Sequence, residues 1–340
     1  MRTFMPGSSS SVRRSASMVA MAACLAVAGC TEQLDAGSTQ AHGLLPVDER
    51  SPVILVNDGA YDNWDGEYAV LMANGAGVTL AGIVVSASAA WSDIDANVVG
   101  WRALVAAARQ SGLHNIPDPT ASINSPLSMP ASGKIEDTQP NRSEGARLII
   151  SLSAQLALPY RPVVVATGTS LTDVADAYLL DPSVADRVVV VSSLGSVNAS
   201  GGVMGIPNGE LDRWADVIVS ARFKYVQVSA FYDEHSDVPD SRLAELPANA
   251  LGDWMRAKQP KIYATAVASD QVSLLAAVLP GFATRVQSVS AVLPLSTGAA
   301  SGPDLATDTA GTALLVNESA GPLATARLWE LLLEPSTFSR

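Results

Sequence analysis

The chain has 340 residues, 48% of them hydrophobic, which is enough to bury a large core without covalent cross-links. Its 33 acidic residues outnumber the 21 Lys and Arg residues, so the formal net charge is −12 at pH 7. A protein that binds the phosphate backbone needs a basic stripe on its surface. We therefore expect no nucleic acid partner.

The first thirty residues have the order of a secretory signal peptide. Two arginines precede the apolar run Met18–Ala28, which is too short to cross a bilayer and be retained there. The small residues before Cys30 resemble the bacterial lipobox, which implies cleavage before Cys30 and lipidation of its thiol. An ordinary signal peptide with an unrelated cysteine is the alternative. We expect residues 1–29 to be a lipoprotein signal peptide, and the protein to be exported and anchored to a bacterial membrane, facing the periplasm or the cell exterior.

Beyond the leader, residues 30–50 are polar and lack apolar periodicity, so we expect a flexible tether. From residue 51 to residue 340, short apolar runs alternate with stretches of helical periodicity. The predicted strands are Val53–Val56, Val78–Ser86, Pro162–Thr167 and Arg187–Ser192. The predicted helices are Asp65–Ala73, Ile94–Ala108, Ser143–Leu156, Leu171–Leu180 and Leu211–Ala221. This alternation predicts one α/β domain with a mainly parallel sheet flanked by helices, a Rossmann-like core in which ligands gather at the carboxyl ends of the strands.

The segment Ile116–Asn141 interrupts this pattern. It is rich in Pro and Ser and has no periodicity, so we expect a long surface loop, which is either a lid over a site or a simple elaboration. The C-terminal third is less regular. It is predicted to contain a helix at Asp270–Val278, a strand at Val286–Leu293 and a closing helix at Leu323–Leu332.

An acidic cluster directly follows the first predicted strand. Asp58, Asp62 and Asp65 fall within eight residues, just before a predicted helix. The positive end of the helix dipole offsets part of their repulsion, but a hard cation with oxygen ligands would offset it better. A helix cap with an Asx turn is the simpler alternative, and it accounts for Asp65 and Asn63 but leaves Asp58 and Asp62 unexplained. The cluster therefore predicts a metal site.

Four blocks in this order resemble the inosine-uridine-preferring nucleoside hydrolases and their exported relatives. They span roughly residues 51–280 and consist of the acidic cluster, Thr167-Gly168-Thr169-Ser170-Leu171-Thr172-Asp173, Glu210-Leu211-Asp212 and Ser269-Asp270. The resemblance implies a nucleoside-hydrolase-like fold. It also implies hydrolysis of the N-glycosidic bond of a nucleoside or a related ribosyl compound.

The resemblance further implies a Ca²⁺ cofactor and a set of site residues. Asp58, Asp65, the backbone carbonyl of Thr167 and Asp270 would hold the ion, and Asp58 would take a proton from a calcium-bound water as the general base. The residues expected to bind substrate are Asp62, Trp64, Asn208, Glu210 and Asp212.

Several positions depart from the family pattern. Val56 replaces the leading Asp, and Trp64 replaces an Asp that binds ribose. Asp212 stands in place of an Asn, and Ser269 in place of a His. Trp64 and Ser269 both remove groups that the chemistry normally uses, and they favour an alternative function, a surface lipoprotein that keeps the calcium-containing fold and binds a ligand or partner without turnover. Assembly into a homo-oligomer is left open.

Overall fold

The structure is a computed structural model. It describes residues 45, 47, 50–59, 66, 70–73, 79–88, 91–123, 125–193, 208–228, 237–238, 244–258, 266–267, 270–292, 304–307 and 313–334. All of these belong to one compact unit, Gly37–Arg340. The predicted signal peptide, Cys30 and nearly all of the tether lie outside the described residues, as do Asp62, Trp64 and Asp65.

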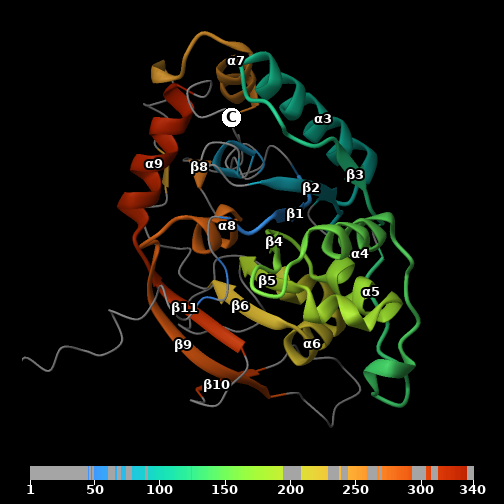
Figure 1. Cartoon of the computed structure of the whole chain (residues 1–340). Coiled ribbons are helices and arrows are strands. Elements are labelled where there is room, and N and C mark those ends of the chain that lie inside the picture. Colours follow the sequence, from blue (N-terminus) through green and yellow to red (C-terminus); the bar gives the residue numbers. More distant parts are fainter. Residues whose placement is uncertain are drawn as a thin grey trace, which may run out of the picture. The chain divides into compact units, whose positions relative to one another are not determined.

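A nine-stranded sheet forms the centre of the described part (Figure 1). Its order is β10-β9-β11-β6-β5-β4-β1-β2-β3, and every pair from β11 to β3 is parallel. At the other end of the sheet, β9 pairs antiparallel with both β11 and β10. The strands are β1 Val53–Asn57, β2 Leu80–Val85, β3 Pro119–Ala121, β4 Val163–Thr167, β5 Val188–Ser193, β6 Lys224–Val228, β9 Ala283–Val292, β10 Asp304–Thr307 and β11 Ala313–Ser319. The predicted mainly parallel α/β sheet is therefore confirmed.

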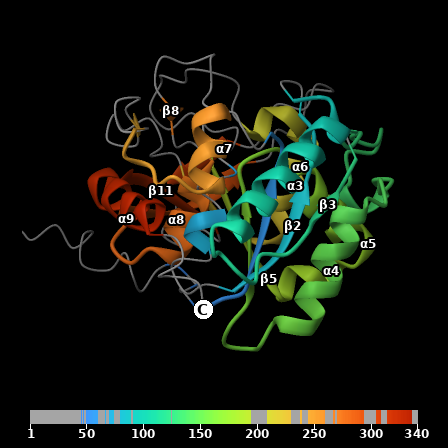
Figure 2. The ribbon, with the colours of Figure 1, turned by 90° about the horizontal axis from the view of Figure 1, so that it is seen from above.

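The central strands are valine-rich because both faces of the sheet are covered. β1, β4 and β5 are buried along their whole length, which is typical of strands that carry helices on both sides. Side chains alternate between two cores, so that Val53 and Leu55 join one apolar cluster while Ile54 and Val56 join the other. The helices lie on both sides of the sheet in Figure 1, and Figure 2 shows them from above. The first cluster includes residues of α3 Ile94–Gln110, α7 Ala250–Lys258, α8 Gln271–Val278 and α9 Gly321–Leu333, and the second includes residues of α4 Glu144–Leu156, α5 Thr172–Leu180 and α6 Arg213–Arg222.

Side-chain caps fix where several helices begin. Asp93 caps α3 and Ser143 caps α4, each by accepting a hydrogen bond from a backbone N–H in the first turn. The predicted helix at Leu211–Ala221 begins two residues later than expected, because Asp212 accepts from the Ala215 N–H and so acts as the cap of α6. The preceding residues form the short 3-10 helix η3, Asn208–Asp212.

The segment Ile116–Asn141 is more ordered than its composition indicates. It contains the edge strand β3, which pairs with β2, and the short 3-10 helix η1, Ile135–Asp137. Leu127 and Ile135 are buried in the second core cluster. A proline is tolerated as the first residue of β3 because the strand lies at the edge of the sheet. The prediction of a plain surface loop is wrong for these parts.

The C-terminal third completes the sheet with strands that the sequence pattern hides. β9 begins three residues before the predicted strand, and β6, β10, β11 and α7 were not predicted. Two further short strands, β7 Asp237–Val238 and β8 Ala266–Val267, form a separate antiparallel pair. Of the predicted helix at Asp65–Ala73, residues 70–73 are helical and buried, and most of the remainder lies outside the described residues. In the part of the chain that the structure describes, no helix combines the length and the apolar character that a membrane crossing requires.

Candidate functional site

The carboxyl ends of three neighbouring parallel strands bring the chemistry-bearing residues to one edge of the sheet. Asp58 follows β1, Ser88 follows β2, and Thr169 follows β4. β1 lies between β2 and β4, with Asn57 in register with Val85 and Val56 in register with Thr167. Residues more than a hundred positions apart in the chain therefore meet at this edge, where parallel sheets bind their ligands.

Asp58 is the buried carboxylate at the centre of this edge, with 6% of its surface exposed. Its Oδ1 accepts from the Gly59 N–H at 2.7 Å, and its Oδ2 accepts from the Thr169 hydroxyl at 3.1 Å. Trp101 Nε1 donates to its backbone carbonyl at 3.0 Å. Burial raises the pKa of Asp58, and hydrogen bonds from Ser88, Gly59 and Thr169 oppose part of that rise. The result is a carboxylate that is fixed in orientation and more basic than one in water.

Asp270 reaches the same edge from the start of α8. A Cβ atom placed on Gly168 would lie only 2.1 Å from the Cβ of Asp270 and 2.5 Å from its Cγ, so glycine is what allows this close approach. Asn208 Nδ2 donates to Asp270 Oδ1 at 3.4 Å. Gly168 contacts Asp270, and the next residue in the chain, Thr169, donates a hydrogen bond to Asp58. The two carboxylates therefore both lie next to the segment that directly follows β4.

These groups suit a hard cation. Two carboxylates beside a strand-end carbonyl are oxygen donors of the kind that Ca²⁺ prefers. At the end of β1, the buried Nδ2 of Asn57 has no hydrogen-bond partner among the described residues, but this atom is a hydrogen-bond donor and does not serve as a ligand of a cation. Within the described ranges no group of three acidic, histidine or cysteine side chains comes together, and Asp65, the third predicted carboxylate, lies outside those ranges.

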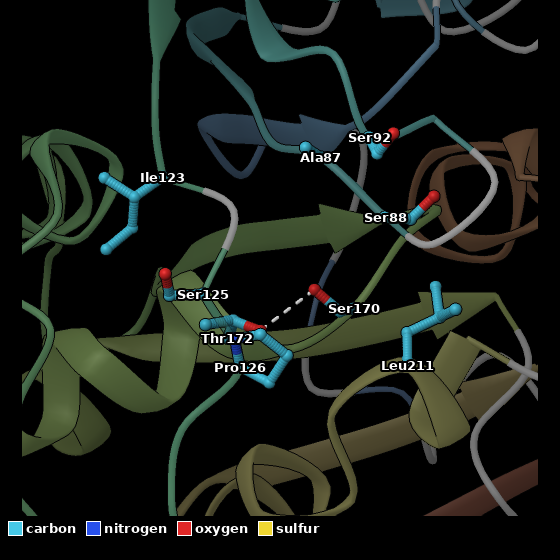
Figure 3. A pocket seen from close by; sticks show the side chains of 9 residues that line it. All are labelled: Ala87, Ser88, Ser92, Ile123, Ser125, Pro126, Ser170, Thr172 and Leu211. Carbon is cyan, nitrogen blue, oxygen red and sulfur yellow. Dashed lines mark hydrogen bonds between the residues drawn. The ribbon is translucent and has the colours of Figure 1, made fainter.

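A pocket of about 170 Å³ opens at this edge of the sheet (Figure 3). Its described lining carries no charged side chain and consists of Ala87, Ser88, Ser92, Ile123, Ser125, Pro126, Ser170, Thr172 and Leu211. In Figure 3, Ser170 and Thr172 lie on the side of the β4–α5 turn, across from Ala87, Ser88 and Ser92. Ser88 connects the pocket to Asp58, since its hydroxyl is one of the groups that hold that carboxylate. Five hydroxyl groups with apolar neighbours form a lining suited to a neutral, hydroxylated ligand.

The other predicted substrate residues are only partly described. Asn208, Glu210 and Asp212 lie in η3, next to the pocket residue Leu211, but the side chain of Glu210 lies outside the described part. Asp212 is buried, with 3% of its surface exposed. Burial raises the pKa of its carboxyl group, and four hydrogen bonds to that group offset part of the rise. Its carboxylate is directed at protein groups, including the Leu127 N–H and the Thr172 hydroxyl.

Sequence reasoning missed the hydroxyl residues of the site. Ser88, Thr169 and Ser170 hold Asp58 or line the pocket, yet single Ser and Thr residues after a strand are too common to stand out. The one local signal was Gly168, which directly follows β4 and precedes Thr169 and Ser170.

Comparison with solved structures identifies the fold. A plant nucleoside hydrolase superposes with a TM-score of 0.62 at 15% identity, over 84% of this chain and 99% of that one. An inosine-guanosine nucleoside hydrolase gives 0.59 at 14% identity, over 82% and 98%. An inosine-uridine-preferring nucleoside hydrolase from Bacillus anthracis gives 0.53 at 12% identity, over 83% and 99%. No family model and no curated protein matches the sequence. The chain has the nucleoside hydrolase fold, as the resemblance in sequence predicts.

Proposed function

We propose that the protein hydrolyses the N-glycosidic bond of a nucleoside or a related ribosyl compound, with Asp58 as the general base. The observation that carries this proposal is the position of Asp58. It is a buried carboxylate held by three hydrogen bonds, and one of the groups that hold it, the Ser88 hydroxyl, belongs to a pocket lined by hydroxyl groups. The nucleoside hydrolase fold of the chain supports the same class of reaction.

The residues of this chain have distinct parts in that reaction. Asp58, Asp65, the Thr167 carbonyl and Asp270 would hold Ca²⁺, which when bound supplies a Lewis acid that lowers the pKa of a coordinated water. In this proposal Asp58 is the general base that accepts a proton from the attacking water. The Thr169 hydroxyl, which donates to Oδ2, and the Gly59 N–H, which donates to Oδ1, hold the carboxylate in place.

The pocket binds the sugar in this proposal. The hydroxyls of Ser88 and Ser170 hydrogen-bond to ribose, and Leu211 and Pro126 cover its apolar faces. By the resemblance in sequence, Asp62, Trp64, Asn208 and Glu210 complete the substrate contacts. A substrate without phosphate suits the described lining best, because that lining offers no cation to an anionic group.

The localisation is part of the same proposal. The lipobox resemblance supports an exported protein that is attached to a bacterial membrane through a lipid on Cys30. Its substrate would then be an extracellular or periplasmic nucleoside.

Turnover of purified protein with Ca²⁺ and a panel of ribonucleosides, followed by release of the free base, tests the proposal. Asp58→Asn keeps the size of the side chain but removes the base, and it should lower kcat by roughly 10²–10⁴-fold. Asp253→Asn, an exposed acid of α7 that pairs with Arg256, is the matched control and should leave kcat unchanged. Equal activity of wild type and Asp58→Asn would exclude Asp58 as the base.

A binding protein without turnover is the second candidate. It is favoured by the carboxylate of Asp212, which is directed at protein groups and not at the pocket. Ribonucleoside binding by calorimetry, with no release of base from any compound of the panel, would establish this candidate in place of the hydrolase.

A further inference from the structure

Besides the Trp214 N–H, three donors converge on the buried carboxylate of Asp212. The Ala215 N–H donates to Oδ1 at 3.0 Å, while the Leu127 N–H and the Thr172 hydroxyl donate to Oδ2 at 2.8 Å and 2.7 Å. These donors belong to three different segments, the first turn of α6, the first turn of α5 and the segment after β3. Asp212 therefore joins three pieces of the protein at a single point.

Two of these contacts are made to the walls of the pocket. Leu127 directly follows the lining residues Ser125 and Pro126, so its N–H fixes one wall. Thr172 is itself a lining residue. A change at Asp212 would thus alter the pocket although Asp212 is not among its lining residues.

Asp212 also sets the direction of a chain of hydroxyl groups. An ionised carboxylate only accepts hydrogen bonds, so the single proton of the Thr172 hydroxyl points at Asp212. Ser170 Oγ lies 3.0 Å from Thr172 Oγ1, and since the Thr172 proton is already committed, Ser170 must donate to it (Figure 3). The Ser170 oxygen then has only lone pairs left to offer to the pocket.

We propose that Asp212 is a positioning residue, which anchors the Ser125–Leu127 wall and fixes Ser170 as a hydrogen-bond acceptor for a hydroxyl of the ligand. The identity of that hydroxyl as part of a ribose rests on the proposed function. The anchoring itself does not.

This role explains why the position holds an aspartate in this chain. An asparagine has one acceptor oxygen and one donor nitrogen, and two of the three converging donors are backbone N–H groups that cannot reverse. Its NH₂ group would therefore face an N–H donor in either orientation, at Ala215 or at Leu127. If the NH₂ group faces Thr172, it donates to the threonine oxygen and frees Ser170 to turn its own proton into the pocket.

The test combines steady-state kinetics with amide hydrogen exchange on the full chain. Asp212→Asn should raise KM for a ribonucleoside about tenfold, the effect of one lost hydrogen bond, while kcat stays within about threefold. The Leu127 amide should exchange faster in this variant than in wild type. Asp181→Asn is the matched control, because Asp181 accepts from the Ser183 N–H as the cap of η2 Pro182–Asp186, remote from the pocket.

A second pair of variants separates the hydroxyl chain from the cap of α6. Thr172→Val removes the hydroxyl at nearly constant volume and should raise KM as Asp212→Asn does, whereas Thr172→Ser should recover most of the affinity that the valine loses. The increase in KM should vanish for the one deoxyribonucleoside that lacks the hydroxyl bound by Ser170.

Each outcome decides the proposal. A fall in kcat at constant KM, with unchanged exchange at Leu127, would overturn it and make Asp212 a direct contact of the reacting substrate. Unchanged kinetics together with unchanged exchange would also overturn it. If wild type turns over no nucleoside, the proposed function fails, and faster or unchanged exchange at Leu127 still confirms or refutes the anchoring by Asp212.

Discussion

Asp173 is a buried acid that the proposed reaction does not use. Its carboxylate accepts from the hydroxyls of Ser86, Ser122 and Ser143, which follow β2, follow β3 and cap α4. Only 1% of its surface is exposed. Burial raises its pKa most, the nearby Asp176 adds to the rise, and the three hydroxyls lower it. The group holds four elements together at the expense of burying a charge.

We expect Asp173→Asn to stabilise the protein increasingly as the pH rises. A carboxyl group whose pKa is higher in the folded state contributes full stability below its ordinary pKa and loses it as the pH rises through the folded-state pKa. An asparagine does not titrate, and the three hydroxyls can rotate to suit its amide. The free energy of unfolding of the variant, relative to wild type, should thus grow with pH by about 1.4 kcal/mol for each unit of raised pKa.

Urea unfolding between about pH 4 and pH 8 measures this difference. Asp137→Asn, an exposed acid of η1 that accepts from Ser132, is the control and should show no such trend. A variant that becomes less stable than wild type as the pH rises would show that the three hydroxyl bonds outweigh the burial of the charge.

At single positions, the sequence predicts carboxylates better than hydroxyl groups. Asp58 and Asp270 stand out because acids beside apolar runs are rare, and strand polarity then places them at the same edge. Ser88 and Thr169 do not stand out, although both hold Asp58. What a side chain points at is a tertiary property. Asp212 illustrates this, since only its two partners that are distant in the chain, Leu127 and Thr172, show that it anchors the pocket wall.

Among the elements, the turn between β4 and α5 is the tightest part of the site. Gly168 has the side chain of Asp270 directly against it, at a distance where a Cβ atom does not fit. Gly168→Ala should push Asp270 and the start of α8 away, lowering the melting temperature through a loss of about 1–3 kcal/mol and weakening Ca²⁺ binding.

Thermal unfolding with and without Ca²⁺ checks this expectation, because an ion that binds only the folded state raises the melting temperature. The increase caused by Ca²⁺ should be smaller for Gly168→Ala than for wild type. Gly133→Ala is an informative control. Gly133 has a φ of +67° and open space around it, so an alanine there strains the backbone without touching the site. If both variants lose stability but keep the same stabilisation by Ca²⁺, Asp270 is not a ligand of the ion.

The same scale shows which elements a sequence predicts. β1, β4 and β5 are continuous apolar runs, and their bounds agree with prediction to within one residue. β6 was not predicted because the polar residues Lys224 and Gln227 leave it without a continuous apolar run, although Gln227 is buried. β11 pairs with β6 on one side and with β9 on the other. Such long-range pairing leaves no pattern in the local sequence from which the strand could be predicted.

For the molecule as a whole, attachment to a membrane depends on a single residue in our proposal. Cys30→Ser removes the thiol that a lipid would modify. The variant should move from the detergent phase to the aqueous phase in a temperature-induced detergent partition, while the specific activity of the protein stays unchanged. Continued partition of the variant into detergent would show that another part of the chain attaches the protein.

The common direction of the parallel strands has a consequence for how such an anchored protein meets its ligand. The chain enters the sheet at Pro52, whose carbonyl accepts from the Val164 N–H at 2.8 Å, at the amino ends of β1 and β4. The pocket lies at their carboxyl ends, about 17 Å away for five residues of extended strand. Pro52 and the pocket thus lie at opposite ends of the central strands. In the lipid-anchored protein that we propose, shortening the segment between Cys30 and Ser51 should therefore leave the affinity for the ligand unchanged.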